Sequence, residues 1–386
     1  MIPLLHTPEG VRDIYGSEKR ELRALSDCVC NCMRNFGFEE IQTPSFEYFD
    51  VFSSERGTVP SKDMYKFIDR DGNTLVLRPD MTPQIARAAV TYWKNAPAPI
   101  RLSYIGNTFI NNSGYQLRLK ETTQAGVEIF GDDSCVADAE VIALTVECLR
   151  AAGLTEFQIE IGNAGFFRAI ANSCGLTSED EEELRRRIKD KNLFGISDFL
   201  AERNIAGKEA ELLLALPELF GSEEILSKAS SLTDNEAALA AIARLQSLWD
   251  CLTKYGVQKF VSFDLAMLSK YRYYTGIIFR AITYGTGEAI ASGGRYDSLA
   301  GQFGEPTPAI GMSITLDSLL TVLQRMGLEE RKPSERYAIV YRAEQAAEAI
   351  AMACGKRVEG IPVALVPDGR GVKDALEKEG VIVWNI

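Results

Sequence analysis

The segment Arg101–Gly131 constrains the fold of this 386-residue chain more than any other. Two short apolar runs, Leu102–Ile105 and Val127–Phe130, flank a polar stretch that has Gly114 at its middle. Apolar runs that are separated by a polar, glycine-containing stretch predict two strands. We therefore expect a long antiparallel hairpin here.

The second arm of this hairpin carries two polar side chains at an even spacing. Gln124 and Glu128 are four residues apart, so on a regular strand both leave the same face of the sheet. A carboxylate beside an amide predicts the floor of a small polar pocket. The alternative interpretation is a hydrogen-bonded Gln124–Glu128 pair in the core of the sheet.

The composition is that of a soluble globular protein with room for two or three domains. The chain is 46% apolar and 9% aromatic. Its net charge of −12 repels a phosphate backbone from most of the surface. The N-terminus lacks the features of a signal or transit peptide, and no apolar run is long enough to span a bilayer. We expect a cytoplasmic protein that contacts neither nucleic acid nor membrane.

The cysteines do not predict a metal site. Cys28, Cys30 and Cys32 lie close together, but they fall inside a helical pattern. A second Cys/His cluster at metal-ligand spacing is missing from the sequence. The pattern favours reduced and mostly buried thiols.

The N-terminal part of the chain predicts two helix–strand units. Apolar residues recur at helical spacing from about Ser17 to Phe36, Gly37 ends this helix, and Phe38–Pro44 follows as a strand. Further on, a strand is ended by proline and a helix begins close to Asp80 and Thr82. Taken alone, these two residues are typical of helix caps.

The domain organisation follows from where strand-like alternation stops and resumes. Residues 1–165 and 256–326 form the two parts of one core, and 166–255 form an inserted helical subdomain without strands. Within the insertion, Gly195 and Pro217 are helix breakers, and a capping box is expected from Ser178 to Glu181. Residues 333–386 form a small C-terminal α/β domain after the linker Gly327–Pro333.

The hairpin, with its GVEIFG ending, resembles motif 2 of class II aminoacyl-tRNA synthetases, and most of all that of histidyl-tRNA synthetase. In that family a Phe-Arg-x-Glu signature opens the motif, with its Arg on the α-phosphate of ATP and its Glu at the adenine. An ungapped count places the signature on Phe109–Asn112, with Ile110 in place of the arginine and Asn112 in place of the glutamate. An isoleucine cannot bind a phosphate, because the binding depends on charge-assisted hydrogen bonds.

Further segments resemble the same family and occur in the family's order: Thr7–Asp13, Phe38–Pro44, Arg78–Thr82, Tyr273–Thr275, Ala291–Asp297 and Ala309–Ser318. The Phe38–Pro44 segment resembles motif 1, which forms the dimer interface of the synthetases. The catalytic arginine of the family falls on Ser269, and the ATP-binding arginine of motif 3 falls on Ser318. With Ile110, three arginines that serve ATP or the transition state are replaced, which indicates abandoned catalysis.

The C-terminal domain is about half as long as the anticodon-binding domain of the synthetases. From Pro333 onward it has seven basic and eight acidic residues, which predicts no basic stripe for an anticodon. A histidyl-tRNA synthetase body without its catalytic arginines and with such a short tail resembles the regulatory subunits of short-form ATP phosphoribosyltransferase. The resemblance covers nearly the whole chain.

This resemblance implies an α+β fold with a class II aminoacyl-tRNA synthetase-like antiparallel sheet and flanking helices. It implies a non-catalytic subunit without a cofactor, which forms a homodimer within a hetero-octamer and activates the short catalytic subunit. It also implies histidine as an effector, through feedback inhibition of the first step of histidine biosynthesis. The residues implied for histidine are Asp80 and Thr82 at the ammonium, Gln124 beside them, and Glu128, Tyr274 and Tyr296 around the imidazole.

Two other functions remain open at this point. One is an active histidyl-tRNA synthetase in which other residues bind ATP. The other is a synthetase-like amino-acid sensor that belongs to a different pathway.

Overall fold

The computed structural model describes residues 5–52, 59–96, 99–112, 119–267, 273–327 and 335–385. The chain divides into two compact units, Met1–Glu329 and Glu330–Ile386. The boundary falls within the linker that we expected between Gly327 and Pro333, most of which lies outside the described residues.

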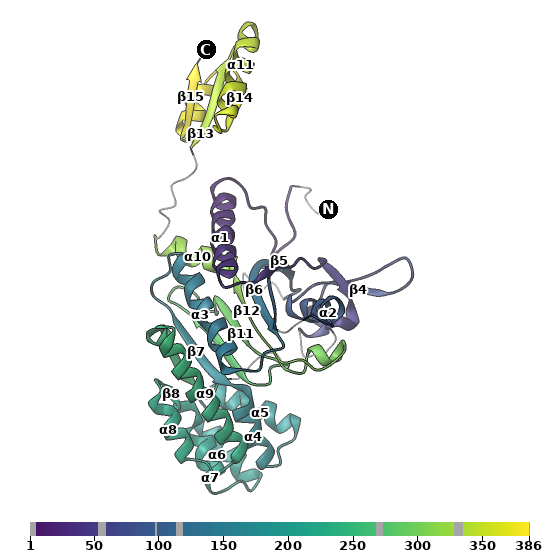
Figure 1. The fold of residues 1–386 in the computed structure, drawn as a ribbon, viewed down its shortest axis with the longest axis vertical. Helices are drawn as coiled ribbons and strands as arrows, with labels where there is room; N and C mark the ends of the chain where they lie inside the picture. The colour runs from purple at the N-terminus through teal and green to yellow at the C-terminus, as the bar shows by residue number, and fades with distance from the viewer. Residues whose placement is uncertain are drawn as a thin grey trace. The chain divides into compact units, whose positions relative to one another are not determined.

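A nine-stranded mixed sheet is the centre of the first unit (Figure 1). Most neighbouring strands are antiparallel, but β1 is parallel to β5 and β7 is parallel to β9. In sheet order the strands are β1 (Glu39–Glu40), β5 (Ile100–Phe109), β6 (Glu121–Phe130), β12 (Ala309–Thr315), β11 (Ala291–Arg295), β10 (Ile277–Ile282), β7 (Gln158–Asn163), β9 (Val261–Asp264) and β8 (Phe220–Gly221).

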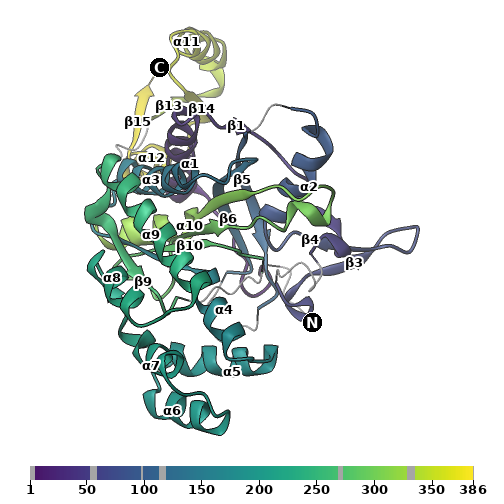
Figure 2. The ribbon, with the colours of Figure 1, turned by 60° about the horizontal axis from the view of Figure 1, so that its bottom comes forward.

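Helices cover the sheet unevenly, which leaves its two faces different in chemistry. On one face α1 (Gly16–Asn35), α3 (Cys135–Ala151) and α10 (Leu316–Arg325) pack against apolar side chains of the strands (Figure 2). The opposite face carries α2 (Thr82–Tyr92), whose buried residues pack among tyrosines rather than among aliphatic side chains alone. This second face holds most of the residues that the sequence predicts for a binding site.

The long hairpin predicted from the sequence is confirmed, and it is longer than expected. β5 and β6 pair in antiparallel register from Ile100 opposite Phe130 to Phe109 opposite Glu121. The predicted turn residue Gly114 lies outside the described residues. Pairing over ten residues places polar side chains at the outer end and buried ones at the inner end.

The first predicted helix is confirmed, whereas the strand that follows it is mostly wrong. α1 ends before Gly37, whose φ of +79° lies in the left-handed region that glycine tolerates best. Instead of Phe38–Pro44, only Glu39–Glu40 is a strand, at the edge of the sheet beside β5. Arg78 explains the short strand, because its guanidinium donates to the carbonyl oxygens of Thr43 and Pro44 and holds them away from the sheet.

A second, three-stranded antiparallel sheet follows β1 in the chain. It has the order β2 (Phe46–Tyr48), β4 (Thr74–Leu77) and β3 (Lys66–Ile68). One face covers a small apolar cluster that contains Phe52 and Val76. The other face leaves Phe46, Tyr48 and Phe67 exposed.

The region 166–255 is helical, but two details of the prediction are wrong. Its capping box joins Thr177 to Asp180, not Ser178 to Glu181, because Thr177 is the residue with extended backbone before the helix. Gly195 does not break a helix, because it lies in the first turn of α6. The helices are α4 (Ala164–Ser173), α5 (Ser178–Lys189), α6 (Leu193–Glu202), α7 (Lys208–Ala215), α8 (Glu224–Ser231) and α9 (Glu236–Lys254).

This helical region is also tied to the main sheet by a strand that the sequence did not indicate. The two residues of β8 pair with β9 at the sheet edge, Phe220 opposite Asp264 and Gly221 opposite Phe263. A strand of two residues is too short to give a periodic signal. Pro217 lies in the short 3-10 helix η5, just before β8. The 3-10 helices of the described residues are η1 (Phe49–Phe52), η3 (Ser61–Asp63), η5 (Leu216–Glu218), η6 (Gln258–Phe260), η7 (Ala300–Gln302) and η8 (Ala343–Gln345).

The second unit is a small α/β domain with a parallel sheet in the order β14 (Val363–Pro367), β13 (Arg336–Tyr341) and β15 (Val381–Asn385). The helices α11 (Ala346–Val358) and α12 (Val372–Lys378) connect these strands. Its core is small and centres on Ile339, Ala349 and Ala353.

Candidate functional site

Two glycines lie next to Glu128 across the neighbouring strands of the sheet. In the strand register, Glu128 of β6 faces Gly311 of β12, and Gly311 faces Gly294 of β11. A Cβ atom on Gly311 would overlap the Glu128 carboxylate. A Cβ atom on Gly294 would lie 2.8 Å from the ring of Tyr274. The two glycines therefore make room for the Glu128 carboxylate and the Tyr274 ring.

The Glu128 carboxylate is almost fully buried, with 1% of the residue exposed. Thr82 Oγ1 donates a hydrogen bond to Glu128 Oε1 at 2.7 Å, and the Tyr296 hydroxyl donates to Oε2. Both contacts join segments that are far apart in the chain, the start of α2 and the end of β11. The predicted alternative, a Gln124–Glu128 pair, is wrong because these two hydroxyls are the partners of Glu128.

Asp80 lies just before α2. Its Oδ1 accepts from the backbone N–H of Thr82 at 3.3 Å, and its Oδ2 accepts from the Tyr273 hydroxyl at 3.4 Å. The capping interpretation is wrong for Thr82, since the N-cap of α2 is Met81 and Thr82 is the first residue of the helix. It holds in part for Asp80, whose side chain accepts the first backbone N–H of α2. The Thr82 hydroxyl is directed at Glu128 instead.

The electrostatics of this pair of carboxyl groups are unusual. Burial raises the pKa of Glu128 to about 8, although the hydroxyls of Tyr296 and Thr82 act in the opposite direction. Burial also raises the pKa of Asp80. Neither carboxylate forms an ion pair within the described residues. A ligand that brings a positive charge or N–H donors would therefore find acceptors that the protein itself leaves without a cation.

The remaining predicted residues lie at the more open end of the site. Gln124 is half-buried on β6, opposite Gly106 of β5 and Thr315 of β12. At about 3.4 Å per residue, its Cα lies roughly 14 Å along the strand from that of Glu128. The amide and the carboxylate therefore leave the same face of β6 at two separate places rather than side by side.

Tyr104 and Tyr273 also belong to this site, although the sequence analysis did not place them in it. Tyr104 is buried on β5 opposite Gly126, and a Cβ atom on Gly126 would overlap its hydroxyl. The Tyr273 ring meets the Tyr296 ring edge to face at 5.7 Å. A signal for Tyr104 exists only once the strands are paired, because the register then places it opposite Gly126.

The positions where the synthetases bind ATP have a different character here. The Ile110 side chain packs against the small apolar cluster around Phe52 and Val76. Asn112 has a buried Oδ1 without a hydrogen bond within the described residues. Ser318 is half-buried in the first turn of α10, and Ser269 lies outside the described residues. Ile110, Asn112 and Ser318 supply no guanidinium and no carboxylate.

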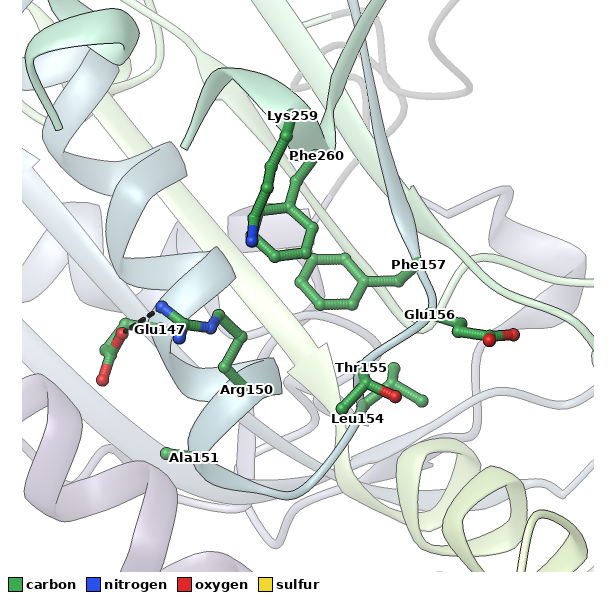
Figure 3. Close-up of a pocket in the computed structure, with 9 residues that line it drawn as sticks. All are labelled: Glu147, Arg150, Ala151, Leu154, Thr155, Glu156, Phe157, Lys259 and Phe260. Atoms are coloured by element: carbon green, nitrogen blue, oxygen red, sulfur yellow. Dashed lines mark ion pairs between the residues drawn. The ribbon is translucent and has the colours of Figure 1, made fainter. Parts of the chain in front are cut away.

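Two cavities of the structure lie away from these residues. One has a volume of about 630 Å³ and is lined by residues of α3, of the loop before β7 and of η6 (Figure 3). The other, of about 230 Å³, lies between Arg12, Asn107 and Asp317. None of the six residues predicted for histidine lines either cavity.

Within the described residues, we find no group of three or more His, Cys, Asp or Glu side chains that could hold a metal ion. The cysteines of the described part, including Cys28, Cys30 and Cys32, are free thiols. None of the helices in this part of the chain is both long and apolar enough to cross a membrane.

Comparison with known proteins agrees with the fold. The histidyl-tRNA synthetase family profile matches residues 10–319. A histidyl-tRNA synthetase from Nostoc shares the fold at a TM-score of 0.79 and 22% identity, over 98% of this chain and 90% of that one. The protein is thus of the class II, histidyl-tRNA synthetase-like type.

Its relatives define the family more narrowly. An ATP phosphoribosyltransferase regulatory subunit from Acetivibrio thermocellus is 40% identical over 95% of this chain and 87% of its own. The crystal structure of an ATP phosphoribosyltransferase regulatory subunit/histidyl-tRNA synthetase from Bacillus halodurans has a TM-score of 0.88 and 30% identity, covering 99% of both chains. The chain belongs to the family of ATP phosphoribosyltransferase regulatory subunits.

Proposed function

We propose that this chain activates the short catalytic subunit of ATP phosphoribosyltransferase, confers feedback inhibition by histidine and catalyses no reaction itself. The observation that carries the proposal is the pair of carboxylates, Asp80 and Glu128, which accept from hydroxyl groups and have no cationic partner among the described residues. At the same time Ile110 and Ser318 occupy positions that serve ATP in the synthetases. The protein has kept acceptors suited to an amino acid and has lost donors suited to a triphosphate.

Histidine fits the chemistry of the site. Asp80 with Thr82 would accept the α-ammonium group, and Glu128 would accept an imidazole N–H while Tyr296 or Tyr274 serves the other ring nitrogen. Each carboxylate oxygen has two lone pairs, so an imidazole N–H can add to Glu128 without displacing Thr82 or Tyr296. Gln124 lies further along the same face of β6, where its amide would bond the polar end of the ligand.

The direct test reconstitutes the enzyme. The purified chain is mixed with the short catalytic subunit from the same source, and phosphoribosyl transfer to ATP is followed with and without histidine. We expect activity only in the mixture, and we expect histidine to inhibit it. A catalytic subunit that works equally well alone and ignores histidine in the mixture would contradict the proposal.

The rival function, an active histidyl-tRNA synthetase, has a separate test. Each lost arginine removes a contact to phosphate charge of the kind worth about 3–4 kcal/mol in comparable sites. We therefore expect no histidine-dependent exchange of pyrophosphate into ATP by the pure chain. Robust exchange would favour the synthetase.

A sensor for another pathway is distinguished by its partner. Affinity capture of this chain from its source cell should bring down a short phosphoribosyltransferase, and we place both proteins in the cytoplasm. Capture of a different enzyme in stoichiometric amounts would favour the other pathway.

We also propose that the chain forms a homodimer within a hetero-octamer, through Phe38–Pro44 and the small sheet that follows. Phe46, Tyr48 and Phe67 of that sheet are 51%, 54% and 41% exposed, although large apolar side chains are normally covered. Phe46 and Phe67 meet edge to face at 5.9 Å and form one continuous patch. Light scattering at micromolar concentration should give a dimer, and Phe46→Asp should shift it toward monomer.

A further inference from the structure

The larger cavity is independent of the site described above. It lies where α3 ends, on the sheet face opposite the tyrosine-rich one, between the loop into β7 and the short helix η6 (Figure 3). Its volume of about 630 Å³ is within the range of small-molecule sites. The lining residues are Glu147, Arg150, Ala151, Leu154, Thr155, Glu156, Phe157, Lys259 and Phe260.

Two aromatic rings form one wall of this cavity. The rings of Phe157 and Phe260 are stacked, with centroids 4.7 Å apart and planes only 4° from parallel. Phe157 is buried and Phe260 is half-buried, so the pair extends from the core to the cavity. A stacked pair presents a flat apolar surface that a further planar ring can extend.

Two cationic side chains line the same cavity, Lys259 from η6 and Arg150 from α3. Figure 3 shows the Lys259 ammonium beside the Phe260 ring and the Arg150 guanidinium turned toward Glu147. Arg150 lies 3.7 Å from Glu147, but both side chains are about half exposed, so this pair is weak. The Lys259 ammonium lies 4.9 Å from the centroid of the Phe260 ring and forms no ion pair within the described residues.

Arg150 and Lys259 bring two positive charges to one cavity of a chain that is acidic as a whole. With a net charge of −12, most of the surface repels anions, so an anion site requires local cations. The lining also holds the carboxylates of Glu147 and Glu156, but the Arg150–Glu147 pair is half exposed and weak, so a more highly charged anion can compete for Arg150. A phosphate monoester carries nearly two negative charges at neutral pH, which matches two cations better than a single carboxylate does.

We propose that this cavity binds a phosphate monoester that carries a planar aromatic ring, the class to which mononucleotides belong. The phosphate lies between Arg150 and Lys259, and the ring lies against the Phe157–Phe260 pair. Thr155 also lines the cavity, on the side of the Phe157 ring away from the two cations (Figure 3).

The test is a calorimetric or NMR titration of AMP into the whole chain. We expect binding in the submillimolar range, about fivefold to tenfold weaker for Arg150→Gln or Lys259→Gln, and not measurable for the double variant. Arg23→Gln is the matched control, because Arg23 is also an exposed helical arginine paired with a nearby carboxylate, Asp27. The control should bind AMP like the wild type.

Two further arms separate the parts of the ligand and the two sites. Adenosine and inorganic phosphate should each bind at least tenfold more weakly than AMP. Equal binding of phosphate alone would overturn the role of the aromatic wall, and AMP binding that survives in the double variant would overturn the site itself. Glu128→Ala should leave AMP binding unchanged, so this result does not depend on the histidine site.

Discussion

Glu128 and Asp138 are both buried carboxylates of the same core, but they have opposite surroundings. Asp138 of α3 is 0% exposed and lies between two guanidinium groups. Arg295 Nη2 of β11 is 2.7 Å from Asp138 Oδ1, and Arg244 Nη2 of α9 is 2.5 Å from Oδ2. Glu128, by contrast, has the hydroxyls of Thr82 and Tyr296 as its partners among the described residues.

The difference shows which buried charge serves the fold and which is available to a ligand. Burial raises the pKa of Asp138, but Arg295 and Arg244 both act against this effect. Asp138 thereby joins three elements, α3, β11 and the helix α9 of the inserted region. Burial raises the pKa of Glu128, and within the described residues the hydroxyls of Tyr296 and Thr82 oppose this rise but no cation does, so a ligand that brings a cation or N–H donor would stabilise its charge.

The largest effect is expected where the buried charges are paired. Asp138→Asn leaves Arg295 and Arg244 without their carboxylate, and breaking a buried pair in this way costs about 3–5 kcal/mol in the free energy of unfolding. Urea denaturation measures it. Asp27→Asn, which removes an exposed partner of Arg23, should cost less than about 1 kcal/mol. Equal effects of the two variants would show that the Asp138 bridge contributes no more than a surface pair.

The second prediction concerns the dependence of stability on pH. Because the pKa of Glu128 is raised from 4.5 to about 8, its contribution to stability is fully present below about pH 4.5 and is lost as the pH rises toward 8. Glu128→Gln stays neutral and keeps polar atoms for Thr82 and Tyr296. Relative to wild type, this variant should therefore gain about 2–4 kcal/mol in the free energy of unfolding between pH 5 and pH 8.

Denaturation curves at pH 5, 6, 7 and 8 measure this gain. The difference between the two proteins cancels the contributions of carboxyl groups that do not interact with Glu128, such as Asp317, whose pKa is also raised by burial. A constant difference across this range would mean that Glu128 is already charged in the folded protein.

The contrast between the two carboxylates also shows what the sequence could predict. Glu128 was found because it lies within a strand pattern and a family motif, both of which are local. Asp138 lies within α3, but its partners lie 106 and 157 residues away and come from different elements. No periodicity connects such residues, so a charge cluster formed by tertiary contacts is invisible until the chain is folded.

The same reasoning explains the other successes and failures. The helix α1 and the hairpin were predictable from periodicity. The strand at Phe38–Pro44 was too long in the prediction because Arg78 holds its end away from the sheet. Tyr104 was missed because the importance of its position depends on Gly126 in the neighbouring strand.

The third prediction tests whether Glu128 is available to a ligand. Glu128→Ala removes the acceptor for an imidazole N–H in a buried site, which costs about 1.5–3 kcal/mol. Histidine affinity should fall roughly tenfold to a hundredfold in a calorimetric titration. The reconstituted enzyme should lose its response to histidine in parallel. If the variant binds histidine like wild type, the regulatory site lies elsewhere, and a subunit interface becomes the next place to look.

The smallest effect is expected at Gln124, further along β6 from Glu128. Gln124 is only half-buried and lies about 14 Å along the strand from Glu128, so it would bond the polar end of histidine where water can compete. A hydrogen bond of this kind contributes about 0.5–1.5 kcal/mol, so Gln124→Ala should weaken histidine binding about threefold to tenfold. Imidazole alone reaches only the Glu128 end, and its weak binding should be reduced by Glu128→Ala but not by Gln124→Ala. If both variants weaken imidazole binding equally, histidine does not extend from Glu128 to Gln124 in the orientation that we propose.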